Sequence, residues 1–426
     1  MKDELFFNIW RNKFIRNEIS KQLLFIVNEF KSFNSKKEII DYEWIEFVKN
    51  IQYRGKETLE VGDLPTNGII YSLFYSSVGE ILPNSLPQTI RELEIDFLLL
   101  NHYKFIRDTI PNCLRSLTIT SFIIGHSITI CSNCLPETLK SLVIVAPKLF
   151  IEDGSLPNSL ESLYLMDMEV VDFKQSIFKD FEKSELIDLS IQCENGTIGN
   201  QSFSNRLTSL IYSFRGYSSP TLIKKEFFQS PSSIEFLEIR LKNELQKFGD
   251  QVIPITTKNL HISLENSDQK ICKNLIPQSV ESLGFFFKTF RPNHDLIEPF
   301  SIPLSVKKIE INENYNVPIK LNIFPQNLKE LKFCCNFNQP LDEPGIFPNS
   351  LTSLVLPRGF NQNILPGVLP SSLEYLWFFS PLLKPIESNI LPSNLKALYL
   401  KEGLNLHDII SNPLSLDPSL NILKVR

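Results

Sequence analysis

The sequence of 426 residues lacks the motifs from which an enzymatic activity is usually inferred. It contains no Gly-x-Gly-x-x-Gly, no Walker phosphate loop and no Gly-x-Ser-x-Gly, so it offers neither a phosphate cradle nor a nucleophile elbow. We therefore expect that the protein is not an enzyme and has no catalytic residue, cofactor or metal ion. The five histidines are scattered along the chain and share no metal-ligand spacing: His102, His126, His261, His294 and His407.

An excess of positive charge is also missing, as are long apolar runs. The formal net charge of −5 argues against a nucleic-acid partner, for which a basic patch is expected. No run of eighteen apolar residues occurs, so we expect no membrane span. The first ten residues include Asp3 and Glu4 and no apolar region long enough for a secretory signal. These features predict a cytoplasmic protein.

Cysteine is sparse and does not form a disulfide framework. Seven cysteines, an odd number in a long chain, indicate free thiols in a reducing compartment. Cys131 and Cys134 are the only pair with the spacing of a metal or redox site, and no second such pair or histidine cluster accompanies them. We interpret them as small apolar side chains that line the core at a turn before Pro136, with a zinc site as the alternative.

Proline is plentiful, with 27 residues against 15 glycines, and it marks a repeated phrase. The phrase reads Pro-x-Ser/Asn-Leu-x-x-Leu-x-Leu, and we call its first position the proline slot. The spacing between slots averages roughly 24 residues, which lies in the range of leucine-rich-repeat-like coils. The fifteen slots fall at 87, 111, 136, 157, 183, 204, 231, 254, 277, 303, 325, 348, 370, 392 and 417, with proline in all but Lys183, Ser204 and Asp417.

The last two leucines of the phrase stand two residues apart, which is the side-chain alternation of a strand. Stacked coils therefore predict a repeat solenoid of about fifteen coils over 56–426, with a parallel β-sheet on the concave face and irregular turns on the convex face. In the coil of Pro370, Leu376 and Phe378 should point into the core. Proline fixes φ and has no N–H group, so it fits a turn just outside the sheet.

The second half of several coils carries a further sequence pattern. Phe337-Asn338-Gln339-Pro340-Leu341, Phe360-Asn361-Gln362-Asn363-Ile364 and Tyr315-Asn316-Val317-Pro318-Ile319 are three copies of one pattern. They resemble the FNIP repeat family, whose members are similar to leucine-rich-repeat proteins and are mostly of unknown function. The resemblance is specific over 303–391. We expect the aromatic residue to fill the core from the convex side, and the asparagine to bond backbone groups of neighbouring coils.

The first 55 residues follow a different pattern. Apolar residues at helical spacing predict one helix from Leu5 to about Phe30 and a second from about Lys36 to Ile51, with Ser35 as N-cap and Glu38 in the capping-box position. We expect 1–55 to cap the first coil or to serve as a docking segment.

Two alternatives for this segment remain open. It invites comparison with an F-box, which would make the protein a substrate adaptor of a ubiquitin ligase, although the opening Leu-Pro of an F-box is absent. Residues 8–27 are basic and amphipathic, so the first helix could instead be the target of a calmodulin-type sensor or lie on an anionic membrane.

A solenoid without catalytic motifs is expected to act as a protein–protein interaction scaffold through the solvent side of its strands. We predict that large aromatic residues on that side bind a protein partner. The last strand also offers an edge for self-association. The predicted binding residues are Tyr375, Trp377, Phe379 and Tyr399, with Phe236 and Phe286 similarly placed in earlier coils.

Overall fold

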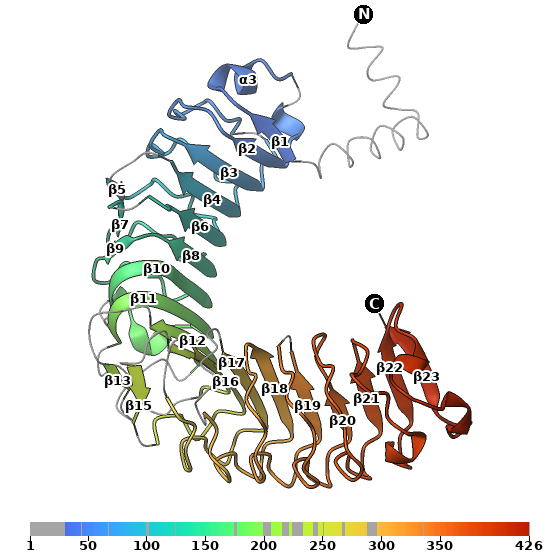
Figure 1. Ribbon diagram of the computed structural model, residues 1–426. Coiled ribbons are helices and arrows are strands. Elements are labelled where there is room, and N and C mark those ends of the chain that lie inside the picture. The colour runs from blue at the N-terminus through green and yellow to red at the C-terminus, as the bar shows by residue number, and fades with distance from the viewer. Residues whose placement is uncertain are drawn as a thin grey trace, which may run out of the picture. The chain divides into compact units, whose positions relative to one another are not determined.

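The computed structural model describes residues 30–425 except 44, 67, 99–101, 124, 174–176, 199–205, 215–220, 224–232, 242–245, 250, 266–268, 288–295 and 335. The chain divides into two compact units, residues 1–199 and 200–426. Each unit is a stack of parallel strands joined by turns, with little helix (Figure 1).

In unit 1 the strands form two rows. The main row pairs in parallel in the order β1, β2, β3, β4, β6, β8, β10, β11, and a second row pairs β5 with β7 and β7 with β9. The strands are β1 (Phe30–Phe33), β2 (Asn50–Tyr53), β3 (Ser72–Ser77), β4 (Glu92–Phe97), β5 (His102–Phe105), β6 (Ser116–Thr120), β7 (Ser127–Ile130), β8 (Ser141–Val145), β9 (Lys148–Ile151), β10 (Ser162–Phe173) and β11 (Asp188–Ile198).

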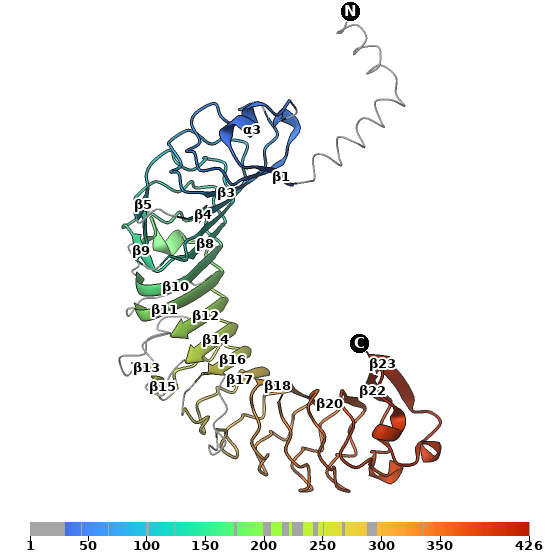
Figure 2. The ribbon, with the colours of Figure 1, turned by 45° about the horizontal axis from the view of Figure 1, so that its top comes forward.

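In unit 2 the main row pairs in parallel in the order β12, β14 and β16 through β23. Two short strands, β13 (Thr221–Ile223) and β15 (Gln246–Phe248), pair separately. Figure 2 shows the later strands of this unit following one another along the stack, with the turns extending below them in this view. The main row comprises β12 (Ser209–Phe214), β14 (Phe236–Leu241), β16 (Asn259–Leu264), β17 (Ser282–Phe287), β18 (Lys308–Glu313), β19 (Glu330–Phe333), β20 (Ser353–Val355), β21 (Tyr375–Phe378), β22 (Ala397–Lys401) and β23 (Asn421–Val425).

The repeated phrase accounts for these strands. After fourteen of the fifteen proline slots, from Pro87 to Pro392, a main-row strand begins five residues later. In the coil of Pro370 the three apolar positions of the phrase, Leu373, Leu376 and Phe378, are almost completely buried. The predicted solenoid and its strand register are thus confirmed for these coils.

In several coils, including those of Pro348 and Pro370, the serine of the phrase bonds one coil to the preceding one. Its hydroxyl donates to a backbone carbonyl of the preceding coil, as from Ser350 Oγ to the oxygen of Leu328 (2.6 Å) and from Ser372 Oγ to that of Leu351 (2.7 Å). These carbonyls lie outside the strands, so the side chain satisfies groups that the sheet does not reach.

The turns that contain the FNIP pattern have the buried aromatic residue and the bonded asparagine that the sequence predicts. Tyr315, Phe337 and Phe360 are buried, and their rings stack in sequence with centroid separations of 6.4 and 6.2 Å. The asparagines form a ladder: Asn338 N–H donates to Asn316 Oδ1 (2.8 Å), and Asn361 N–H donates to Asn338 Oδ1 (3.0 Å). Each side chain therefore accepts from the backbone of the next coil.

The prediction of a second helix is correct for its first turn and wrong beyond it. The helix α3 covers only Lys36–Ile40, and the chain then forms a 3-10 turn, Ile45–Phe47, and strand β2. Ser35 is the N-cap as predicted, because its Oγ accepts from Glu38 N–H (3.2 Å), but the Glu38 carboxylate accepts from Asn34 rather than from Ser35. The first predicted helix lies outside the described residues, apart from Phe30, which begins β1.

Strands β1 and β2, which lie within the predicted N-terminal segment, belong to the parallel sheet, because β1 pairs with β2 and β2 with β3. The apolar positions of the phrase are present there as Val48, Ile51 and Tyr53, all almost completely buried. The proline and serine are absent. Pairing with the neighbouring strands therefore determines the structure of this segment, although its apolar residues have helical spacing.

The last strand departs from the predicted register by one residue. Counted from the slot at Asp417, the phrase places Leu423 and Val425 towards the core. In the structure Leu423 lies opposite the outward Tyr399, and Ile422 lies opposite the buried Leu398. Ile422 and Leu423 are 40% and 43% exposed. Since β23 pairs with no other described strand, neither side of it is covered well enough to fix one register.

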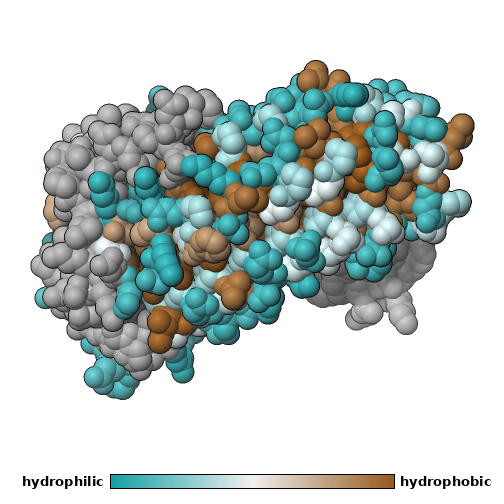
Figure 3. All heavy atoms as spheres, turned by 60° about the horizontal axis from the view of Figure 1, so that its bottom comes forward, coloured by the Kyte–Doolittle hydropathy of each residue, from teal (hydrophilic) through white to brown (hydrophobic). Residues whose placement is uncertain are grey.

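On the side of the molecule that Figure 3 brings forward, hydrophobic residues lie in small groups among hydrophilic ones. In the part of the chain described, no helix is long and apolar enough to cross a membrane.

Candidate functional site

The solvent side of the main strand row in unit 2, which we call the open face, carries the residues at five and seven positions after each slot. Burial alternates along the strands: in β21, Leu376 and Phe378 are buried, whereas Tyr375 and Trp377 are half-buried. The strand pairing aligns these positions into rows, so side chains from successive coils become neighbours.

Three predicted residues form one aromatic cluster, which we define as Tyr375, Trp377 and Tyr399. Trp377 of β21 lies in register with Tyr399 of β22, and their rings stack at 4.3 Å with planes only 4° apart. Tyr375 lies 6.2 Å from Trp377 in a tilted arrangement. The rings support one another in a fixed orientation while remaining half-exposed.

Two further residues extend the cluster along its row. Val355 of β20 is in register with Trp377, and Leu423 of β23 is in register with Tyr399. Sequence reasoning missed both, although Val355 stands seven positions after its slot and could have been found by the same count. Ion pairs border the cluster, with Lys396 Nζ 2.8 Å from a Glu374 oxygen and Lys332 Nζ 2.7 Å from a Glu310 oxygen.

The other predicted site residues lie apart from this cluster or at its edge. Phe379 is half-buried and follows the last residue of β21. Phe236 and Phe286, on β14 and β17, flank the ring of His261 on β16, with centroids at 5.1 and 5.4 Å. Gly284 makes room for that ring, since a Cβ there would lie 2.7 Å from His261 Cδ2.

His261 belongs to a charged group that sequence reasoning did not identify. Glu238 is in register with His261, is only 9% exposed, and accepts from Arg240 Nε at 2.6 Å. Burial raises the pKa of the Glu238 carboxyl, but the hydrogen bonds with His261 and Arg240 outweigh it and leave the pKa below its usual range. The open face thus holds a buried, charged carboxylate beside a histidine whose ring lies between two phenylalanines.

The corresponding face of unit 1 is polar. Asp96 of β4 accepts from Ser76 Oγ at 3.2 Å and from Thr120 Oγ1 at 3.3 Å, so one carboxylate joins three adjacent strands. Tyr164 donates its hydroxyl to Asp188 at 3.0 Å. Side chains on this face bond mainly to one another, whereas those of the aromatic cluster present apolar surface.

The second member of the cysteine pair has the properties of a buried structural residue. Cys134 is buried, and burial raises the pKa of its thiol to about 12, which is the property of a structural rather than a nucleophilic cysteine. Within the described ranges, no three His, Cys, Asp or Glu side chains lie close enough to hold a metal ion.

Comparison with known proteins identifies the repeats. The FNIP Repeat family model matches residues 292–336 and 337–380, which overlap most of the range 303–391 that resembles this family. A search of curated proteins finds no match.

One solved structure with a similar fold is a leucine-rich-repeat protein. CroV588, described as a novel circular LRR protein, is 23% identical, with a TM-score of 0.58 and coverage of 89% of this chain. This chain spans only 60% of the length of CroV588. YopM from Yersinia enterocolitica is 17% identical, with a TM-score of 0.38 and coverage of 89% of this chain and 77% of YopM. Residues 292–380 therefore contain FNIP repeats, and the fold of the chain is similar to that of a leucine-rich-repeat solenoid.

Proposed function

We propose that this protein is a non-enzymatic protein–protein interaction scaffold in the cytoplasm, and that the aromatic cluster of unit 2 is its principal binding surface. The observation that carries the proposal is the stacked pair of Trp377 and Tyr399 on the open face. Half-exposed aromatic rings in a fixed orientation lose little side-chain entropy on binding, and tryptophan and tyrosine are enriched among residues that dominate interface energies.

The surroundings support a protein partner. Val355 and Leu423 extend the apolar surface, and ion pairs stand around it, as in interfaces with an apolar centre and a polar rim. Five cysteines of the described residues are free thiols, and this favours a reducing compartment.

The test replaces both Trp377 and Tyr399 by serine and compares proteins enriched from a lysate of the source cells with those enriched by the parent chain. Partners of the cluster should be depleted by at least about tenfold while circular dichroism and Tm stay nearly unchanged. Phe150→Ser, which removes a ring that is 58% exposed on β9 of unit 1, is the matched control. Equal enrichment by parent and double variant would reject the cluster as the binding surface.

The same experiment examines the two hypotheses for the N-terminal segment. An adaptor must enrich ligase core subunits through residues 1–55, and a sensor target must enrich a calmodulin-like protein through residues 8–27. The aromatic cluster should not affect either association.

We also propose that β23 supports self-association. It pairs only with β22 among the described strands, and Ile422 and Leu423 expose apolar surface on its two sides. Such an edge can pair with the strand of a second copy. Ile422→Lys with Leu423→Lys should abolish any concentration-dependent increase in mass in sedimentation experiments, and a purely monomeric parent chain would disprove the proposal.

A further inference from the structure

The turns that lead into the strands share an unusual backbone conformation. At ten positions, each three residues before a proline slot, φ is positive. Nine are glycine or a short or flexible polar residue, which adopt this conformation most readily, and Phe300 is the exception at φ 60°. The ten positions are Asn84, Asp108, Asn133, Gly154, Gln251, Asn274, Phe300, Asn322, Gly345 and Gly367.

Burial does not compensate Phe300 for this strain. Its ring is 68% exposed, and Leu304, in the same turn, is 56% exposed. Ile302 and Phe324 lie buried beneath them, and the four residues line a groove of about 250 Å³. A bulky apolar residue is thus held in a disfavoured conformation where it gains little from the core, a pattern found at functional sites.

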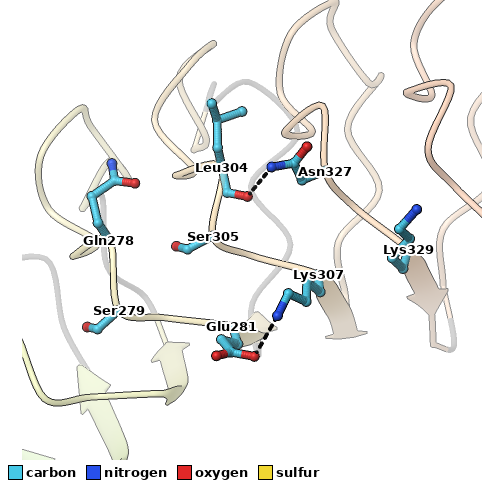
Figure 4. Close-up of a pocket in the computed structure, with 8 residues that line it drawn as sticks. All are labelled: Gln278, Ser279, Glu281, Leu304, Ser305, Lys307, Asn327 and Lys329. Atoms are coloured by element: carbon cyan, nitrogen blue, oxygen red, sulfur yellow. Dashed lines mark hydrogen bonds and ion pairs between the residues drawn. The ribbon is translucent and has the colours of Figure 1, made fainter.

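A second groove, of about 440 Å³ (Figure 4), shares Gln278 and Leu304 with the first. Its lining comes from three successive coils and includes Gln278, Glu281, Lys307 and Lys329. Lys307 Nζ lies 3.0 Å from Glu281, so these two charges neutralise each other. Ser279 and Ser305 contribute hydroxyl groups that have no partner in the protein.

Lys329 differs from Lys258, Lys307 and Lys396, the other lysines at its position in the repeat in unit 2. Each of these three, four residues after its slot, forms an ion pair with a glutamate of the preceding coil, as Lys258 with Glu235 at 2.7 Å and Lys396 with Glu374 at 2.8 Å. Lys329 has the neutral Thr352 at the next position, and no carboxylate of the described residues pairs with it. The groove therefore ends at an exposed, uncompensated positive charge.

We propose that these turns form a second docking surface, the Phe300 groove, defined by Gln278, Phe300, Leu304, Phe324 and Lys329. Its occupant is an extended segment of a partner protein in which one apolar side chain lies close to a carboxylate. The apolar side chain packs between Phe300 and Leu304 over Phe324, and the carboxylate pairs with Lys329. This surface lies on the turns and is separate from the aromatic cluster.

Two pools of fluorescent nine-residue peptides test the proposal by polarisation titration with the full chain. Both pools carry one Leu or Phe, with two Glu or Asp at varied spacing in the first pool and two Lys or Arg in the second. Members of the acidic pool should bind with Kd below about 100 μM, and the basic pool should not bind. Absence of binding by every acidic member, or equal binding by the basic pool, would overturn the proposal.

Phe300→Asn provides the sharper variant, because asparagine occupies the same position at Asn274 and Asn322. It should weaken the best peptide by about tenfold, yet raise Tm by about 1–3 °C as the backbone strain is relieved. Loss of both stability and binding would show that the ring is structural. Lys329→Gln should weaken binding about three- to fivefold, and less so at high salt.

The double variant of Trp377 and Tyr399 should bind the peptide as the parent does, so failure of one proposal can be told from failure of the other. If Phe300→Asn instead abolishes self-association in sedimentation experiments without any peptide binding, the groove is an interface between copies of this chain, and the proposed occupant is wrong.

Discussion

Unit 1 and the FNIP coils of unit 2 satisfy the backbone of their second turns in different ways. In unit 1 a second row of strands, β5, β7 and β9, pairs four residues at a time through backbone hydrogen bonds. In the FNIP coils the corresponding pairing shrinks to single bridges, Leu341 with Ile364 and Ile386 with Ile410. The asparagine ladder of Asn316, Asn338 and Asn361 takes over the remaining backbone groups.

This difference gives a physical reason for the FNIP pattern. A strand row needs several consecutive residues in extended conformation, whereas an asparagine side chain carries both an acceptor and a donor and can bond across coils from a turn. Phe337 and Phe360 then occupy the core beneath that turn. The FNIP pattern therefore allows a compact turn in which the asparagine side chains accept hydrogen bonds from backbone N–H groups.

The largest effect that tests this comparison is expected for Asn338→Ala. The N–H of Asn361 loses its acceptor, and Asn338 Nδ2 no longer donates to Asn361 Oδ1 at 3.0 Å. Because the ladder is partly exposed and water can replace some bonds, we expect a local cost of about 1–2 kcal/mol. Hydrogen exchange at Asn361 should accelerate accordingly, by about 5- to 30-fold.

Thr129→Ala in β7 is the matched control in unit 1, since backbone pairing there does not depend on the side chain. Exchange at its neighbours Ile128 and Ile130 should change less than about threefold. If the two substitutions have the same effect, the asparagine ladder does not replace the second strand row.

A second contrast lies on the open faces, where only unit 2 places a carboxylate as deeply as Glu238 within the described residues. Its pKa is lowered, because hydrogen bonds with His261 and Arg240 exceed the effect of burial. A lowered pKa in the folded state adds stability above the unfolded value of about 4.5, and that stability is lost as pH falls through the folded value.

Glu238→Gln should therefore destabilise unit 2 by about 1–2 kcal/mol at pH 7. The difference from the parent should shrink below pH 4.5, and urea denaturation followed between pH 7 and 3 measures it. A difference that is constant over this range would mean that packing, not charge, holds Glu238 in place.

The sequence predicts the solenoid and most of the aromatic cluster because both follow from counting along one coil. Leu376 and Phe378 are buried and Tyr375 and Trp377 half-buried, as the two-residue alternation requires. The coil of β2 was not predicted because Val48, Ile51 and Tyr53 are not accompanied by the proline and serine of the phrase, and the neighbouring apolar residues have helical spacing.

Other features depend on how coils align, which a single coil does not specify. The group of Glu238 and His261 arises from register between β14 and β16 together with the space above Gly284. Likewise, the one-residue shift of β23 brings Leu423 beside Tyr399 instead of into the core. Whether the aromatic cluster binds a partner stays a prediction.

The smallest expected effect concerns the serine of the phrase, for which unit 2 contains its own control. Ser350 Oγ donates to the oxygen of Leu328 at 2.6 Å, whereas the buried Oγ of Ser305, in a neighbouring part of the same row, has no partner. An intramolecular hydrogen bond contributes about 0.5–1.5 kcal/mol, and an unsatisfied buried hydroxyl contributes nothing and costs its desolvation. Ser350→Ala should thus lower the free energy of unfolding by about that amount, while Ser305→Ala should leave it unchanged or raise it slightly. Both values come from urea denaturation under one set of conditions. If both substitutions lower the free energy of unfolding equally, the serine acts by packing in the turn. If Ser350→Ala lowers it and Ser305→Ala raises it, the hydrogen bond of the serine hydroxyl joins one coil to the next.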